Sequence, residues 1–170
     1  DQVRSNADVP LQPDREATEL LTQQALLRRE KSWASAFFGT GIWTTQRAGV
    51  ASSPTGSQFL RWDEAASTPI ENVRAAKTAV HSSTGMRPNK LVLGRQVYDA
   101  LLDHPDLVGR VDRGQTTGPA MVMRQTLAAL FELDEVLVMD GIENTAVEGA
   151  AGSYSFIGGK HALLVYAPPS

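Results

Sequence analysis

The spacing of apolar residues predicts an unusually long helix in the first part of the chain. Between residues 14 and 38, apolar side chains recur at close to helical spacing, at Ala17, Leu20, Leu21, Leu27, Ala34, Phe37 and Phe38. Asp14 suits the N-cap position, and Gly39 and Gly41 end the pattern. Such a helix spans about 35 Å, because each residue adds about 1.5 Å. A mean globular helix has only about 11 or 12 residues. We therefore expect this helix to support an extended structure and to lie outside the compact core.

The remainder of the chain predicts a compact unit of helices and strands. Thr68 suits an N-cap, Pro69 the first helical position, and Glu71 completes a capping box, so a helix begins here and continues to Gly85. The other predicted elements are a short strand at Phe59, Leu60 and Trp62, strands at 90–94, 135–139, 156–157 and 161–166, and helices at 96–102 and 121–131. The predicted loops or connectors are residues 1–13, 49–57, 114–119 and 144–153. Together these elements predict an α+β chain with an α/β unit over about residues 60–167.

Composition narrows the possible functions. The formal net charge is −3, whereas a protein that grips nucleic acid nonspecifically needs a basic excess to neutralise phosphates. The chain has no cysteine, which excludes disulfides, thiolate metal ligands and cysteine nucleophiles. No apolar run approaches the roughly 18 to 20 residues that cross a bilayer. The first eight residues are polar, do not resemble a signal peptide and lack an initiator methionine, so we expect a processed or incomplete chain.

Glycines and histidines are the first candidates for chemistry. Gly39-Thr40-Gly41 follows a predicted helix and Gly158-Gly159-Lys160 lies between predicted strands, so both are predicted turns and not phosphate loops. The histidines, which lie far apart in the sequence, lack the spacing of shared metal ligands and are expected at the surface or at helix ends: His81, His104 and His161.

Serines and charged residues offer weaker candidates. Three serines near predicted helix ends do not lie in a Gly-x-Ser-x-Gly turn: Ser67, Ser82 and Ser83. A catalytic triad whose members are brought together only by the fold remains an alternative. An acidic cluster borders the 135–139 strand and predicts a solvated boundary more than a cation site: Glu132, Asp134, Glu135 and Asp140. A mixed run on the long helix predicts a subunit-contact or solvated face more than a nucleic-acid contact: Arg28, Arg29, Glu30 and Lys31.

All three tryptophans, Trp33, Trp43 and Trp62, lie in the first 62 residues. Tryptophan is enriched at protein interfaces, so their position indicates assembly, with ordinary packing of the helix on its neighbours as the alternative. No residue is predicted as catalytic, cofactor-binding or metal-binding.

An ordered series of motifs resembles the major capsid proteins of tailed bacteriophages. The series covers nearly the whole chain, and its order is more specific than any single part. It consists of Arg4-Ser5-Asn6-Ala7-Asp8; the stretch from Arg29-Glu30 to Gly41-Ile42-Trp43; Trp62-Asp63 with Ser67 and Pro69; residues 84–94; Val97 with 101–105; 126–131; 136–138; 144–146; Ile157-Gly158; and 163–166.

The resemblance implies the Hong Kong 97-type capsid fold, with a long spine helix and an axial α/β domain, here truncated at both ends. Residues 1–59 would hold a connector, the spine helix and part of a peripheral domain, and residues 60–170 the axial domain. It also implies a non-enzymatic subunit that self-assembles, through pentamers and hexamers, into the icosahedral shell of a virion. Further implied partners are scaffold, portal or decoration proteins and packaged double-stranded DNA, bound without sequence specificity. No cofactor and no membrane are implied, and assembly would occur in the bacterial host cytoplasm.

Two alternatives remain at this point. A prokaryotic nanocompartment (encapsulin-like) shell protein shares the implied fold and encloses protein cargo. A small α/β hydrolase belongs to another class and would need polar groups that converge in a pocket. The sequence contains no cluster that indicates such a pocket.

Overall fold

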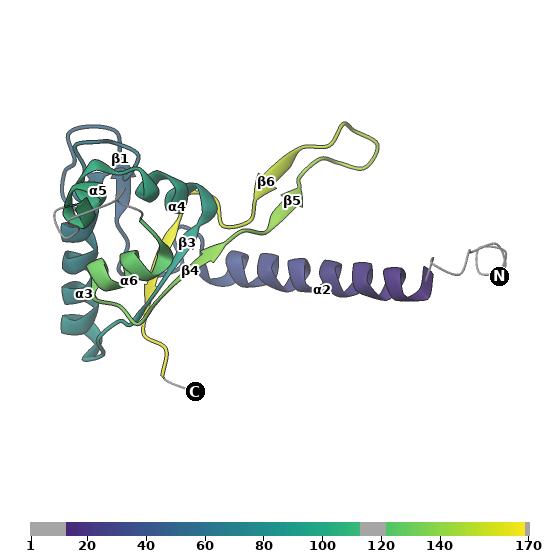
Figure 1. The fold of residues 1–170 in the computed structure, drawn as a ribbon, viewed down its shortest axis with the longest axis horizontal. Coiled ribbons are helices and arrows are strands. Elements are labelled where there is room, and N and C mark those ends of the chain that lie inside the picture. Colours follow the sequence, from purple (N-terminus) through teal and green to yellow (C-terminus); the bar gives the residue numbers. More distant parts are fainter. Residues whose placement is uncertain (1–12, 113–121, 169–170) are drawn as a thin grey trace.

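The computed structural model describes residues 13–112 and 122–168. The described part begins with α2 (Pro13–Phe37), followed by the strands β1 (Ala48–Val50) and β2 (Gln58–Leu60). The central part contains α3 (Pro69–Thr84), β3 (Lys90–Gly94), α4 (Arg95–Leu102), α5 (Pro105–Asp112), α6 (Arg124–Phe131) and β4 (Glu135–Met139). The last elements are β5 (Ile142–Asn144), β6 (Tyr154–Phe156) and β7 (Ala162–Val165). Figure 1 shows that α2 extends away from the other helices, and that the β5–β6 hairpin projects on the same side.

The central sheet has three strands in the order β4-β3-β7. Strand β3 pairs parallel with β4 and antiparallel with β7, so both of its edges are occupied. Four of its five residues are buried, because helices or loops cover both faces of the sheet. Its alternating side chains therefore divide the apolar residues of the sheet between two separate clusters.

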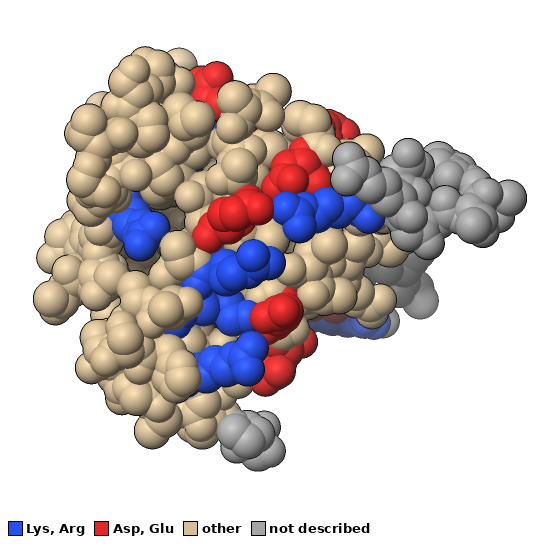
Figure 2. All heavy atoms as spheres, turned by 90° about the vertical axis from the view of Figure 1, so that its left-hand side faces the viewer, with Lys and Arg blue, Asp and Glu red and all other residues tan. Residues whose placement is uncertain are grey.

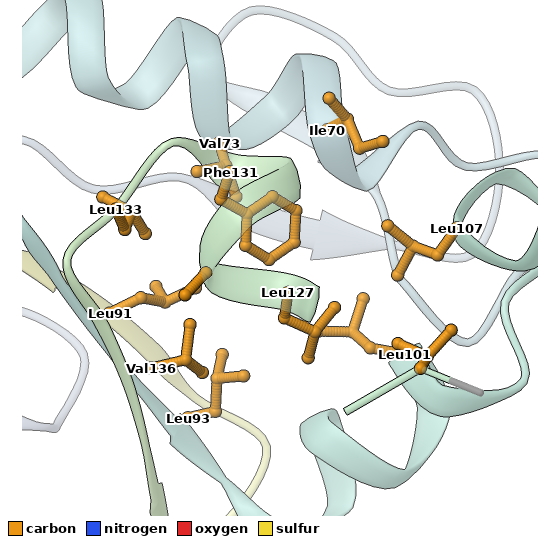
Figure 3. Packing of buried hydrophobic residues seen from close by; sticks show 12 residues of the cluster. Ile70, Val73, Leu91, Leu93, Leu101, Leu107, Leu127, Phe131, Leu133 and Val136 are labelled. Atoms are coloured by element: carbon orange, nitrogen blue, oxygen red, sulfur yellow. The ribbon is translucent and has the colours of Figure 1, made fainter. Parts of the chain in front are cut away.

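The larger cluster lies between the sheet and the helices α3 to α6. Leu91 and Leu93 of β3 point into it with Val136 of β4, and Leu127 and Phe131 of α6 pack on them (Figure 3). Leu93, Leu101 and Leu127 are fully buried. Burial of each such side chain contributes about 1.5–3 kcal/mol to folding, so this cluster is the main source of stability among the described residues.

The second cluster lies on the opposite face of the sheet and includes the end of α2. Ala34 and Phe38 are buried against Val92 and Met139, with Ile157 and Leu163 beside them. The prediction that the long helix lies outside the core is therefore wrong for its last turn. It holds for residues 14–26, whose side chains are all exposed.

The predicted strands 90–94 and 135–139 are confirmed at the same bounds, and the helix predicted over 14–38 is α2 with each bound shifted by one residue. The late strands and the helix 96–102 are confirmed with small shifts, whereas the helix predicted over 121–131 begins only at Arg124. Two predicted loops each contain part of a strand: β1 overlaps 49–57, and β5 reaches into 144–153. The predicted connector 1–13, except for its last residue, and the predicted loop 114–119 lie outside the described residues.

Two predictions about helix ends differ from the structure. Helix α3 begins at Pro69 as predicted, but the Thr68 side chain makes no cap hydrogen bond, and Glu71 instead accepts a hydrogen bond from Arg110 at 2.9 Å. Pro105, predicted only to follow a helix end, is the first residue of α5. A proline suits that position, since its missing N–H has no helical partner there.

Candidate assembly surface

Helix α2 exposes apolar side chains along its length. Leu20, Leu21 and Leu26 are 57%, 70% and 59% exposed. Scattered exposed leucines are common, but these three lie on a helix that projects from the core (Figure 1). The three leucines point to different sides of α2, and no other described part of the chain covers them. Leu26 lies on the same side of the helix as Trp33 and Phe37, which follow it by seven and eleven residues.

An aromatic cluster continues this surface at the C-terminal end of α2. The Trp33 ring lies 5.8 Å from the Phe37 ring and 5.9 Å from the Phe38 ring, and the Trp43 ring lies 6.3 Å from Phe37. The Trp43 indole N–H donates a 2.7 Å hydrogen bond to the Phe37 carbonyl. Phe38 is buried in the core, whereas Trp33, Phe37 and Trp43 remain partly exposed. Two of the three tryptophans thus lie at the surface, and Trp62 packs against the larger core cluster.

The β5–β6 hairpin forms the other projecting part. Its strands pair antiparallel from Ile142 with Phe156 to Asn144 with Tyr154. The side chains of Val147 and Tyr154 are 77% and 74% exposed. A two-stranded hairpin is only marginally stable alone in water, so its direction depends on contacts at its base.

Residues of α2 contact the base of the hairpin. The Gly141 N–H donates to Glu30 Oε1 at 3.3 Å, and the Gly141 carbonyl accepts from the Ile157 N–H at 2.9 Å. Lys31 forms an ion pair with Glu143. Of the predicted mixed run on the long helix, Arg28 and Arg29 are exposed, whereas Glu30 and Lys31 contact the hairpin base.

The structure brings together one serine and one histidine of those considered for catalysis. Ser67 Oγ lies 2.9 Å from His104 Nε2, and both side chains are buried. His104 Nδ1 accepts a 3.2 Å hydrogen bond from the Asp106 N–H, so in a neutral ring the proton is on Nε2. Nε2 therefore donates, to Ser67 or to the Glu64 carbonyl at 3.2 Å, and cannot take the serine proton as a general base must. His104 caps α5, which confirms the helix-end alternative for this histidine, although its ring is buried.

The other candidates for chemistry remain apart. His81 is exposed in the last turn of α3, and His161 is exposed with its ring edge-on to Phe38. Ser82 and Ser83 donate to carbonyls of their own helix. Within 13–112 and 122–168, no group of three His, Asp or Glu is placed to hold a metal ion.

Each acidic residue around β4 has a different partner. Glu132 pairs with Lys77 and Arg87, and Glu135 pairs with Lys90. Asp134 accepts a hydrogen bond from the Asn89 side chain, and Asp140 pairs with Arg95 and Arg124. Hydrogen bonds to Asp99 and then to Asp140 raise the pKa of Arg95, so this arginine stays charged. The predicted acidic cluster is therefore a set of separate surface contacts, in which three of the carboxylates form ion pairs and Asp134 accepts a hydrogen bond.

Both glycine-rich segments lie in bends or turns, as predicted. Gly41 has a positive φ of 87° and its N–H donates to Gln46. Gly158 and Gly159 lie against the end of β3, where a Cβ on Gly94 would be 2.2 Å from the Gly159 carbonyl oxygen. This close approach of two backbone segments gives no sequence pattern beyond the glycines themselves.

The role of Lys77 is visible only in the structure. Its ammonium donates 2.8 Å hydrogen bonds to the carbonyls of Phe131 and Glu132, at the C-terminal end of α6. The side chain is buried, and these carbonyls would otherwise lack a helical partner. Lys77 thus joins α3 to α6 and completes the end of that helix.

Charges on the face that includes α3 have both signs. Figure 2 shows basic and acidic side chains in neighbouring groups, separated by uncharged surface. Arg110 of α5 pairs with Glu71 of α3 and with Asp106 of its own helix. This face therefore lacks the continuous basic surface that neutralises phosphates. None of the described helices is long and apolar enough to span a membrane.

Comparison with known proteins identifies the family. The family described as "Phage major capsid protein E" matches residues 60–163. The chain belongs to this family. The chain is 30% identical over 161 residues to a curated relative, the major capsid protein of Pseudomonas phage JBD67. It is 25% identical over 108 residues to that of Burkholderia phage BcepMu.

These alignments cover 95% and 64% of this chain, but only 49% and 33% of the relatives. The chain thus spans at most about half the length of the curated relatives that it matches. A crystal structure of a phage-related protein from Bordetella bronchiseptica RB50 superposes with a TM-score of 0.70 at 24% identity. The superposition covers 99% of this chain and 53% of the Bordetella protein, which shows that the two share a fold.

The family and its capsid relatives confirm the predicted resemblance to phage major capsid proteins. The mixed helices and strands confirm the α+β class. Membership in a capsid protein family places the chain among structural proteins. Neither alternative, a nanocompartment shell protein or a small α/β hydrolase, is supported by these comparisons.

Proposed function

We propose that the chain is part of a subunit that self-assembles into the icosahedral shell of a phage virion. The family and the capsid relatives support this proposal. The structural observation that carries it is the set of exposed leucines on α2, a helix whose residues 14–26 are all exposed. Burial of such exposed apolar side chains by neighbouring copies is favourable by about 25 cal/mol per Å².

The finer organisation follows the Hong Kong 97-type arrangement. Helix α2 would be the spine of residues 1–59, and residues 60–170 would form the axial domain. Many modest contacts among copies in pentamers and hexamers then close the shell, because each subunit has several neighbours and their affinities combine. Scaffold, portal or decoration proteins are further partners, and assembly takes place in the host cytoplasm.

The packaged DNA is held without sequence-specific contacts. The net charge of −3 and the mixed charges of the α3 face support this, since affinity for phosphates depends on a basic excess. A weakly repelling wall allows DNA to move during packaging.

Electron microscopy of the full-length protein tests the proposal. We expect uniform closed shells from the parent protein, and roughly tenfold fewer shells from the double variant Leu20→Ser with Leu21→Ser, since two leucine contacts of about 0.7 kcal/mol or more each are lost. Because both leucines are exposed, the unfolding midpoint of the unassembled subunit should change little.

Met86→Ser is the matched control, because Met86 is 53% exposed but lies beyond α3, away from α2. It should leave shell yield unchanged. A parent protein that stays monomeric under all assembly conditions contradicts the proposal. Equal shell yields from the double variant and the control would refute the role of α2 alone.

A further inference from the structure

We propose that Glu30 and Lys31 of α2 form a latch that fixes the direction of the β5–β6 hairpin along this helix. The latch is a property of the single subunit, and its use in presenting the hairpin to neighbouring copies rests on the proposed shell function. Three observations carry the inference: the hydrogen bonds of Gly141, the space around its Cα, and the ion pair beyond it.

Gly141 connects three segments through its two backbone polar groups. Its N–H donates to Glu30 Oε1 at 3.3 Å, which joins the end of β4 to α2. Its carbonyl accepts from the Ile157 N–H at 2.9 Å, which joins the two chain segments that leave the hairpin. Gly141 therefore lies where the hairpin meets the core, and Glu30 is the α2 side chain that holds this point.

The packing at this point explains why residue 141 is a glycine. A Cβ built on Gly141 would lie 2.6 Å from Glu30 Oε2 and 2.7 Å from Glu30 Cδ. Any side chain here would displace the carboxylate from the amide. The φ of Gly141 is not in the positive range, so the contact with Glu30, and not the backbone conformation, requires glycine.

The ion pair of Lys31 restricts rotation of the hairpin about the hydrogen bond between Glu30 and Gly141. Lys31 pairs with Glu143, two residues further along β5. A single hydrogen bond would let the hairpin pivot at Gly141, whereas two contacts from adjacent α2 residues define a direction. The core provides the rigid reference, because Ala34 and Phe38 hold the following turn of α2 against Val92 and Met139.

The latched hairpin presents a defined surface. Val147 and Tyr154 are exposed on it, so its direction decides where these apolar groups can meet a neighbouring copy. An unlatched hairpin would have to be ordered on assembly, and that ordering weakens binding.

Carbodiimide crosslinking of the unassembled full-length protein tests the latch. The reagent joins an amine and a carboxylate in contact into an amide, with loss of water, so the yield of a Lys31–Glu143 crosslink reports the direction of the hairpin. The Lys90–Glu135 pair between β3 and β4, at 2.9 Å, provides an internal reference within the core. Mass spectrometry gives the ratio of the two crosslinked peptides.

Glu30→Ala leaves both crosslinking pairs intact and removes only the acceptor for Gly141. We expect the crosslink ratio to fall roughly threefold or more, consistent with the loss of one hydrogen bond to a charged group. Glu30→Gln keeps an oxygen acceptor and should retain most of the ratio. Gly141→Ala should reproduce Glu30→Ala, and combining the two should cause no further fall, because both remove the same contact.

The matched control removes a charge pair from the exposed part of α2. Arg15 and Glu19 form an ion pair at 2.8 Å, and their double alanine variant should leave the ratio unchanged. A ratio that stays at the parent value in Glu30→Ala overturns the latch, as does an equal fall in the Arg15 and Glu19 control. Shell yield is measured separately, so failure of the latch and failure of the proposed shell function are distinguishable.

Discussion

Replacing Gly94 by alanine should destabilise the subunit by about 3 kcal/mol. Gly94 is the last residue of β3 and directly precedes α4. A Cβ at this position would lie 2.2 Å from the Gly159 carbonyl oxygen and 2.7 Å from that of Gly158. Real Cβ atoms essentially never approach other heavy atoms closer than 3.0 Å, so a backbone segment must move.

The surroundings make that movement costly. The opposing atoms belong to the backbone and not to a flexible side chain, and the buried Gly158 also has Met139 and Phe38 close beside it. The Gly94 N–H also donates to the His161 carbonyl at 2.9 Å, a bond that separation of the two segments would weaken. Overpacking typically costs about 1–3 kcal/mol, and loss of a backbone hydrogen bond adds about 1 kcal/mol. We therefore expect a loss of stability near the upper end of the overpacking range, about 3 kcal/mol.

Thermal and urea unfolding of the unassembled protein, followed by circular dichroism, measure this effect. For a chain of this length, about 3 kcal/mol lowers Tm by roughly 6–12 °C. Gly109→Ala is the control, because a Cβ on Gly109 in α5 meets nothing within 4 Å and φ is not positive. That change should be neutral or stabilise by about 0.5–1 kcal/mol through helix propensity. Equal unfolding midpoints for the two variants would refute the close approach between β3 and the turn.

Two further predictions concern the core. Lys77→Met should cost about 1–3 kcal/mol, since it leaves the carbonyls of the buried Phe131 and of Glu132 at the end of α6 without this donor. Urea unfolding should show no comparable loss for the exposed Arg74→Ala, and an equal loss would assign the effect to charge alone. Leu101→Ala should cost about 2–5 kcal/mol because its side chain is fully buried, whereas Leu26→Ala, 59% exposed, should change the unfolding free energy of the subunit by less than about 0.5 kcal/mol. Similar losses from the two leucine changes would contradict the packing of the larger cluster.

Local sequence patterns predicted the elements whose apolar residues form a continuous run or recur at helical spacing. The strands β3 and β4 were predicted at their observed bounds, because β3 is buried almost throughout and both are short apolar runs between polar residues. Helix α2 was predicted within one residue at each end for a similar reason. Its length also indicated correctly that most of it lies away from the core.

Contacts between distant residues decided what the sequence could not predict. The capping box at Thr68 fits the local pattern, but Arg110, 39 residues away, holds the Glu71 carboxylate. The sequence around His104 indicates a helix end but not burial, and only the fold buries this side chain beside Ser67. The contact of Glu30 with Gly141 joins residues 111 positions apart, so no spacing rule could indicate it.

The order of strands in the central sheet has a consequence for synthesis on the ribosome. Strand β3 lies between β4 and β7, and both partners follow it in the chain, the second by about 70 residues. While the nascent chain emerges from its N-terminal end, β3 is exposed for a long interval with both edges unpaired. Unpaired strand edges favour association with other chains. A polysome that makes many copies of this chain side by side therefore has to keep these edges apart until the residues of β7 have left the exit tunnel.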